Sequence, residues 1–164
     1  MTVEGGPDRM PGEYRRGREP LISARVAAAL DAGGELRVWL DDDFEDRAAP
    51  QGWVHVDTVA EVIALLDCGR VVELSLDHDL GDDEGRGRGP EILDWLAEQQ
   101  EMHDRVLWPR DGIALHTANP QGRDAMARTI RRYASRTCHV RESRAGGQPR
   151  FEFDPPSEGA AGQR

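Results

Sequence analysis

Residues 71–79 read Val71-Val72-Glu73-Leu74-Ser75-Leu76-Asp77-His78-Asp79, so an apolar run ends directly in charged side chains. A short run of valine and leucine bounded by turn residues is typical of a buried β-strand. Two other segments have the same form, because Leu36–Leu40 precedes three aspartates and Gly112–Leu115 precedes His116-Thr117. The sequence therefore predicts three strands that each end in polar residues.

Helical patterns alternate with these strands. Thr58 and Glu61 form a capping box before an apolar stripe that ends at Gly69, which predicts a helix. The other elements predicted from the pattern are a helix at about residues 21–31, a strand at Trp53–Val56, helices from Pro90 and over about Gln121–Ala134, and a short last strand at Cys138–Val140.

This alternation predicts an α/β fold with a parallel sheet that is covered by helices on both sides. The connection between the first two strands is unusual, because Asp41–Gly52 is only about a dozen residues long. That length is near the minimum for a parallel crossover. We therefore expect a shortened first crossover, in which any helix must be short.

Four regions are expected along the chain. Residues 1–19 are rich in Gly, Pro, Arg and acids and are predicted to be a disordered tail. Residues 20–34 hold a short helix, residues 35–142 form the main domain, and residues 143–164 are predicted to be a flexible tail. The alternation in Arg150-Phe151-Glu152-Phe153 leaves an added edge strand open.

Composition excludes several classes of function. All 21 basic residues are arginine, so Schiff-base lysines and P-loop lysines are excluded, and the two cysteines form neither a disulfide framework nor a zinc knuckle. No apolar run approaches the length of a membrane span, and no secretory signal opens the chain, so a cytoplasmic protein is expected. The net charge of −10 argues against binding to duplex DNA.

The charge is unevenly distributed along the chain. Residues 41–104 hold 19 acids and four arginines, whereas residues 105–150 hold three acids and ten arginines. The acidic block is either a solvated face or a group of carboxylates around a cation. The basic block either meets the acidic block inside the fold or faces a phosphate-bearing ligand.

The polar strand ends are the strongest functional signal, because the carboxyl ends of parallel strands meet at one edge of a sheet. Asp41, Asp42 and Asp77 would suit Mg²⁺ or Mn²⁺, which prefer carboxylate oxygens. The alternative is that Asp42 and its neighbours are solvated loop acids.

Two histidines adjoin these acids. His78 and His116 are candidates for general base or acid, with Asp79 orienting an imidazole. The alternative for each histidine is a structural role beside a loop carbonyl. Candidates for holding phosphate oxygens are Thr117, Asn119 at a helix N-terminus and Arg123, for which the alternatives are a strand-end β-branched residue and a surface arginine.

These strand ends resemble the receiver domain of bacterial response regulators. That family has an acid pair after its first strand, a phospho-accepting aspartate after its third and Thr or Ser after its fourth. The matching residues here are Asp41 and Asp42, then Asp77, then Thr117. The lysine that follows the fifth strand in that family has no counterpart, since the chain contains no lysine.

Further motifs resemble a divergent branch, the cyclic-phosphate processing receiver domains. The resemblance covers about residues 36–134 and rests on several linked motifs. It implies a receiver/flavodoxin-like three-layer sandwich and an activity on cyclic phosphates, at RNA ends or on nucleotides. The motifs are Leu40-Asp41-Asp42-Asp43 with Arg47, Pro50-Gln51-Gly52-Trp53, Ser75–Gly81, Trp95-Leu96, and His116–Pro120 with Gly122-Arg123 and Met126.

Three functions remain open from the sequence. The first is a metal-dependent phosphoesterase that opens a cyclic phosphodiester, with a phosphate-bearing small molecule or an RNA terminus as its substrate. The second is a non-catalytic receiver-like module that binds a partner protein or a phosphorylated ligand. The third, a receiver that accepts phosphate on Asp77, fits least well because of the missing lysine. The substrate, the metal and the oligomeric state are not fixed by the sequence.

Overall fold

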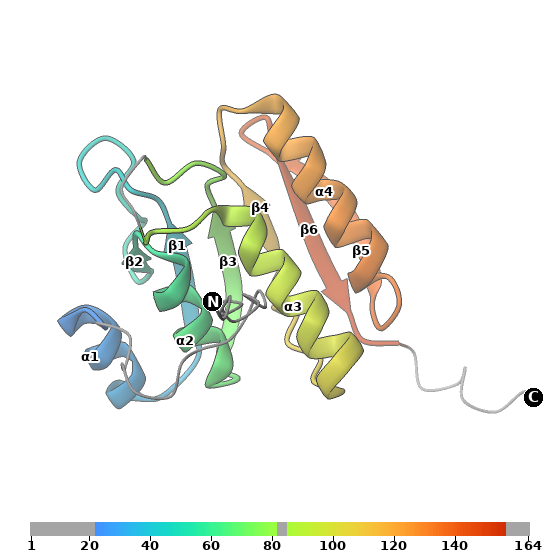
Figure 1. Cartoon of the computed structure of the whole chain (residues 1–164), viewed down its shortest axis with the longest axis horizontal. Coiled ribbons are helices and arrows are strands. Elements are labelled where there is room, and N and C mark those ends of the chain that lie inside the picture. Colours follow the sequence, from blue (N-terminus) through green and yellow to red (C-terminus); the bar gives the residue numbers. More distant parts are fainter. Residues whose placement is uncertain (1–21, 82–84, 157–164) are drawn as a thin grey trace, which may run out of the picture.

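The computed structural model describes residues 22–81 and 85–156 (Figure 1). Helices and strands alternate along the chain as the sequence predicts. They are α1 (Ala24–Ala32), β1 (Leu36–Leu40), β2 (Val54–Val56), α2 (Val59–Asp67), β3 (Val71–Leu76), α3 (Gly89–His103), β4 (Ile113–Leu115), α4 (Pro120–Ala134), β5 (His139–Ala145) and β6 (Gln148–Asp154).

The strands form one six-stranded sheet in the order β2-β1-β3-β4-β6-β5. The first four strands in this order are parallel, while β6 runs antiparallel to both β4 and β5. This mostly parallel sheet with four helices confirms the predicted receiver/flavodoxin-like α/β fold.

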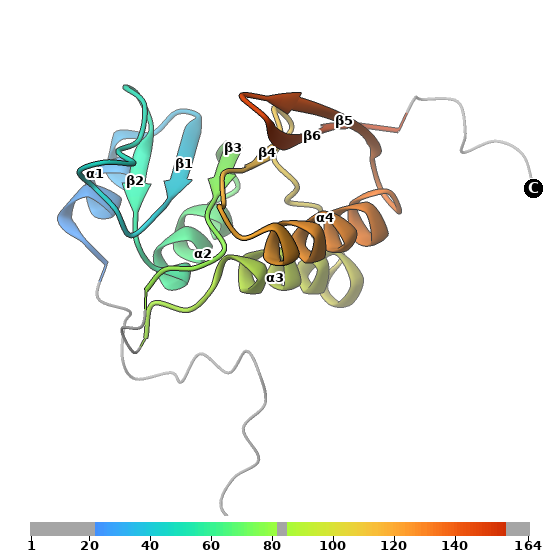
Figure 2. The ribbon, with the colours of Figure 1, turned by 90° about the horizontal axis from the view of Figure 1, so that it is seen from above.

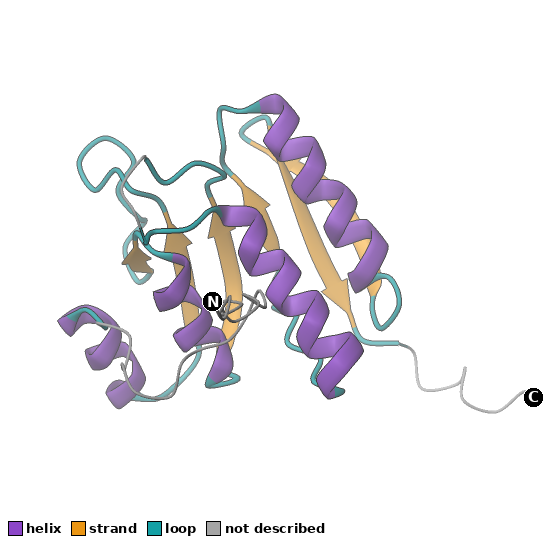
Figure 3. Cartoon of the chain, viewed as in Figure 1, coloured by secondary structure: helices purple, strands orange, loops and turns teal. Residues whose placement is uncertain are grey.

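The helices α2, α3 and α4 lie together on one face of the sheet, as Figures 2 and 3 show. Helix α1 contacts β2 and α2 at the edge of the sheet. Within the described residues these three helices lie on one face of the sheet, whereas the alternation in the sequence favours helices on both faces. The physical reason is the short connection from β1 to β2, in which residues 41–53 form turns and no helix.

Alternation along the strands matches this one-sided cover. In β1, Leu36, Val38 and Leu40 are buried, whereas Arg37 is exposed and Trp39 is half-buried. The apolar residues therefore pack on the helices, and the open face carries polar and aromatic side chains.

Local signals place the helices as predicted. The Thr58 hydroxyl caps α2 by accepting from the Glu61 N–H at 3.2 Å. The buried Glu61 carboxylate accepts from the Thr58 hydroxyl at 3.1 Å and from the Ser23 hydroxyl at 2.6 Å. Because Ser23 is also the N-cap of α1, Glu61 links the start of α1 to the first turn of α2.

The structure corrects the prediction of a flexible tail at residues 143–164. Residues up to Asp154 form a hairpin with β5, and its two-residue turn, Gly146-Gly147, has positive φ at both positions. This turn suits the twist of an antiparallel pair. Strand β6 is not an edge strand, because it pairs with β4 on one side and β5 on the other. Its residues Phe151 and Phe153 are buried in the core.

The predictions for residues 1–19 and for 157–164 lie outside the described residues. Among the described residues, no helix has the length and apolar content needed to cross a membrane.

Candidate metal and phosphate site

The register of the sheet brings three site residues together. Leu40 of β1 pairs with Leu76 of β3, and Leu76 pairs with Leu115 of β4. The residues that follow these paired leucines are Asp41, Asp77 and His116, and one ligand atom from each lies within 4.8 Å of the others. Two carboxylate oxygens and an imidazole nitrogen at this spacing form a donor set that fits a divalent cation.

Asp41 is fully buried at this edge of the sheet. Its Oδ1 accepts from the Asp43 N–H at 2.8 Å, and its Oδ2 lies 3.0 Å from His116 Nε2. Burial raises the pKa of Asp41, and the Asp43 N–H and the charge of Arg47 oppose that rise. A buried carboxylate in this position needs a positive partner to stay ionised.

His116 is held on three sides. Its Nδ1 lies 2.7 Å from the Ser75 hydroxyl, and the Trp39 ring stacks on the imidazole at a centroid distance of 4.3 Å. Burial lowers the pKa of His116, while the nearby charge of Asp41 acts in the opposite direction. Since Ser75 can donate to or accept from Nδ1, it can support either neutral tautomer of the ring. Nε2 can therefore carry a proton and donate to Asp41, or it can be unprotonated and free to bind a metal ion.

Arg47 enters the same group from the turn between β1 and β2. Its guanidinium contacts Asp77 Oδ2 at 2.9 Å, Asp41 Oδ1 at 3.1 Å and Asp42 Oδ1 at 3.3 Å. In the sequence, Arg47 stands only in the motif of the resemblance, and no role is predicted for it. No local pattern could have placed it, because its position depends on how the turn folds back over β1.

Hydrogen bonds between the backbone and the side chains of Asp43 and Trp39 stabilise this turn. Asp43 Oδ1 accepts from the N–H groups of Glu45 and Asp46 at 3.0 and 2.8 Å, which is the local geometry that favours aspartate in turns. The Trp39 Nε1–H then donates to the Arg47 carbonyl at 3.1 Å. The same indole therefore packs on His116 and positions the backbone of Arg47.

A second imidazole–carboxylate pair follows β3. His78 Nδ1 lies 2.9 Å from Asp79 Oδ1, and the Asn119 side-chain amide donates to Asp79 Oδ2 at 3.3 Å. The His78 ring lies against the first turn of α4, where a Cβ on Gly122 would come within 2.4 Å of its Cδ2. Of the two imidazoles that the sequence left open as the partner of Asp79, the carboxylate contacts that of His78.

The predicted phosphate-binding residues are placed differently from one another. Thr117 is buried, and its hydroxyl accepts from the Asn119 N–H at 3.1 Å. Asn119 caps α4 by accepting from the Gly122 N–H at 2.9 Å. Arg123 lines a separate pocket between α4 and β5, beside Arg131 and Glu142. The structure therefore brings Thr117 and Asn119 to the strand ends but gives Arg123 a different environment.

A family model described as the cyclic-phosphate processing receiver domain matches residues 36–132, which is more than half of the chain. The chain belongs to this family. No curated protein and no solved structure matches the chain. The family match spans every strand end described above and stops short of the β5–β6 hairpin.

In this cyclic-phosphate processing receiver domain, the three predicted metal ligands separate into two groups. Asp41 and Asp77 join His116 in the donor set, whereas Asp42 is half-buried and contacts Arg47 and, at 3.8 Å, Arg86. His116, which the sequence analysis assigned a catalytic role, is therefore the third candidate ligand.

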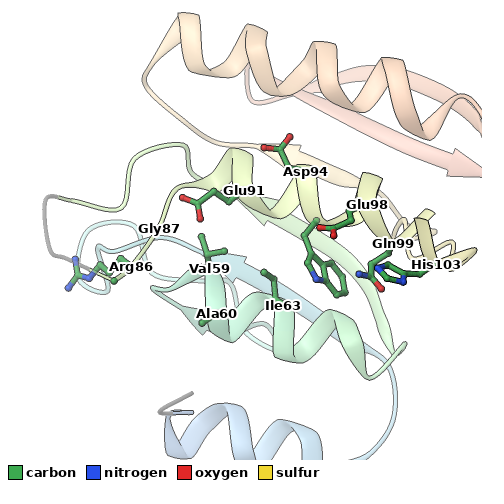
Figure 4. A pocket seen from close by; sticks show the side chains of 12 residues that line it. Val59, Ala60, Ile63, Arg86, Gly87, Glu91, Asp94, Glu98, Gln99 and His103 are labelled. Atoms are coloured by element: carbon green, nitrogen blue, oxygen red, sulfur yellow. The ribbon is translucent and has the colours of Figure 1, made fainter. Parts of the chain in front are cut away.

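The receiver domain also has a cavity of about 520 Å³ between α2 and α3, on the helical side of the sheet (Figure 4). Its lining includes Val59, Ile63 and Trp95, with Glu91 and Glu98 nearby. None of the predicted site residues lines it. This cavity is therefore separate from the strand ends, where Asp41, Asp77 and His116 form the candidate donor set.

Proposed function

We propose that this chain is a metal-dependent phosphoesterase that opens cyclic phosphodiesters, on nucleotides or at RNA ends. The observation that carries the proposal is the presence of two different units at the carboxyl ends of the parallel strands. One is the donor set of Asp41, Asp77 and His116, and the other is the His78–Asp79 pair. Membership of the cyclic-phosphate processing family supports the same substrate class.

Asp41, Asp77 and His116 would hold the cation, which when bound supplies positive charge to polarise a phosphoryl oxygen. Mg²⁺ or Mn²⁺ suits the two carboxylates, and the imidazole nitrogen favours Mn²⁺ of the two. His116 therefore acts as a ligand in this proposal, and proton transfer belongs to His78.

His78 would act at its Nε2. The Asp79 carboxylate accepts from Nδ1–H and so fixes the tautomer in which Nε2 is the basic nitrogen. Nε2 would take a proton from water while the water oxygen bonds to phosphorus and one ester P–O bond breaks. The departing ribose oxygen then takes a proton from the imidazolium, so one phosphodiester bond of the ring is hydrolysed.

A hydrolysis screen tests this function. Purified protein is given 2′,3′-cyclic nucleotides, 3′,5′-cyclic nucleotides and RNA with a cyclic-phosphate end, each with Mg²⁺, Mn²⁺ or chelator. We expect metal-dependent ring opening that falls by at least about 100-fold in Asp77→Asn and in His78→Ala. His103→Ala, an exposed histidine at the end of α3, is the matched control and retains turnover. Turnover that is unchanged in both site variants contradicts the mechanism.

One observation favours the second function, a non-catalytic receiver-like module. Arg47 already pairs with Asp41, Asp42 and Asp77, so the chain itself supplies positive charge to these carboxylates. A module of this kind would bind a phosphorylated ligand or a partner without turnover. Absence of hydrolysis in the full screen, with the protein folded, would favour it.

A further inference from the structure

Arg47 lies where a bound cation would have to compete with it. Its two terminal nitrogens contact Asp77 Oδ2 and Asp41 Oδ1, and these two residues belong to the candidate donor set. A guanidinium and a divalent ion cannot both hold the same oxygen lone pairs. Their charges would also repel strongly at a separation of a few ångströms.

The arginine is nevertheless able to leave. Its side chain is 42% exposed, whereas those of Asp41 and Asp77 are almost fully buried. Its backbone is fixed by the hydrogen bond from Trp39 Nε1–H to the Arg47 carbonyl. Displacement therefore needs only a rotation of the side chain about a fixed backbone position, toward solvent and away from the carboxylates.

We propose that Arg47 and a divalent cation alternate on the carboxylates, and that displaced Arg47 then binds the phosphate of the substrate. This inference rests on the proposed function and adds a phosphate-binding residue to that site. A guanidinium can donate two parallel hydrogen bonds to a phosphate, and it stays charged at all relevant pH values. From its fixed backbone position, the displaced side chain can stay beside Asp42, which directly follows the cation ligand Asp41.

The exchange makes metal binding and phosphate binding cooperative. In the free protein, part of the metal's binding free energy is used to break the Arg47 ion pairs. Once the metal is bound, the guanidinium has lost Asp41 and Asp77 as partners, and phosphate oxygens take their place when phosphate arrives. By thermodynamic linkage, phosphate must then tighten metal binding by the same factor by which metal tightens phosphate binding.

The first test is the affinity for Mn²⁺ alone, measured by calorimetry on the full chain with Arg47→Gln. We expect the variant to bind Mn²⁺ about tenfold more tightly than the wild type, because its competing cation is gone. Arg37→Gln is the matched control, since Arg37 of β1 pairs with Glu73 of β3 and neither residue belongs to the donor set. Equal Mn²⁺ affinity in Arg47→Gln and the wild type overturns the exchange.

The second test is the affinity for inorganic phosphate with and without saturating Mn²⁺. The wild type should bind phosphate about tenfold more tightly with Mn²⁺, and Arg47→Gln should lose most of this gain. A gain of equal size in both proteins assigns the phosphate to the metal and overturns the second half of the proposal. If Arg47→Gln fails to fold, Arg47→Lys retains the charge without the fork and should still weaken phosphate binding.

These outcomes are separate from failure of the proposed function. Tighter Mn²⁺ binding in Arg47→Gln, together with no hydrolysis by any protein, would leave the exchange standing and exclude the phosphoesterase. Hydrolysis with unchanged Mn²⁺ affinity in Arg47→Gln would do the reverse.

Discussion

Among single residues, Gly122 is a glycine whose lack of a side chain leaves room for the His78 ring. It lies in the first turn of α4, where alanine is ordinarily better than glycine by about 0.5–1 kcal/mol. A Cβ there would come within 2.4 Å of the His78 ring. We therefore expect Gly122→Ala to lower the free energy of unfolding by about 1–3 kcal/mol, as overpacking does.

His78→Ala provides the background that isolates this contact. With the ring removed, the Cβ has room, so Gly122→Ala should become stabilising by up to about 1 kcal/mol. A double-mutant cycle from urea unfolding measures the change of sign. If Gly122→Ala stabilises the protein that retains His78, the ring is not confined by α4.

The residue scale also shows what the sequence could predict about the site. Asp41 and Asp77 can be singled out from the sequence because each directly follows an apolar strand, and strand ends meet by topology. Asp42 has the same local signal, yet it faces Arg47 and Arg86 and lies outside the donor set. Arg47 and Ser75 carry no local signal at all. Their roles follow from the fold of a turn and from cross-strand register, and sequence spacing does not encode either of these.

At the scale of elements, β6 is the strand on which the hairpin depends. Phe151 is fully buried and pairs with Ile113 of β4, although the sequence predicts a flexible tail here with an edge strand as the alternative. Phe151→Ala should lower the free energy of unfolding by about 3–5 kcal/mol, because it opens a cavity in the core. Urea unfolding measures it. Glu152→Ala, on the opposite face of the same strand, should cost no more than about 1 kcal/mol.

Equal losses in the two variants would mean that β6 does not contribute to the core. The alternation of Arg150 to Phe153 was visible in the sequence, but four residues between polar segments do not distinguish a strand from a tail. What decides the matter is the glycine turn, which returns the chain antiparallel so that both phenylalanines reach the helices.

The contact between α4 and β5 should make the hairpin sensitive to acid. Glu142 of β5 accepts two hydrogen bonds from the Arg131 guanidinium of α4. These bonds lower the pKa of Glu142 below its ordinary value of 4.5. A lowered carboxyl pKa means that the unfolded chain binds the proton first as pH falls. The stabilisation is therefore present above pH 4.5 and is lost as pH falls through the folded pKa.

Glu142→Gln removes this dependence. Both side chains are about half exposed, so the effect on the free energy of unfolding is at most about 1 kcal/mol. The free energies of unfolding of the wild type and Glu142→Gln should therefore converge as the pH falls from 4.5 through the folded pKa of Glu142, with Glu98→Gln on α3 as the control. A difference that grows as pH falls would contradict this assignment.

At the scale of the whole molecule, the acidic and basic blocks of the sequence meet within the fold. Arg105 pairs with Asp67 at 2.9 Å, Arg136 with Glu101 at 3.1 Å and Arg150 with Glu73 at 2.8 Å. Each pair joins the basic block to the acidic one. Of the two alternatives left open by the charge pattern, these arginines therefore follow the intramolecular one. The pairs Arg105–Asp67 and Arg136–Glu101 are partly exposed and fix orientation more than they stabilise.

Cohesion comes instead from one apolar cluster that runs from Val26 in α1 to Phe153 in β6. Trp108 belongs to this cluster and packs against Phe153 at a centroid distance of 5.6 Å. Trp39 lies on β1, on the other side of the centre of the sheet from Phe153. The β1 side and the β6 side of the molecule belong to one sheet and one apolar cluster. Unfolding of either side would therefore expose the core of the other. We expect one cooperative unfolding transition, as for small single domains.

Tryptophan variants make this expectation testable region by region. Trp39→Phe with Trp53→Phe leaves the fluorescence of Trp95 and Trp108. Trp95→Phe with Trp108→Phe leaves the fluorescence of Trp39 and Trp53, on the β1 side. Within each protein, the urea midpoint by fluorescence should coincide with the midpoint by far-UV circular dichroism, even where the substitutions lower both. A fluorescence midpoint for the β1 side that falls below the midpoint by circular dichroism would show that the site unfolds separately from the sheet. In that case the donor set of Asp41, Asp77 and His116 would depend on local order in the β1–β2 turn, and a bound cation should restore the common midpoint.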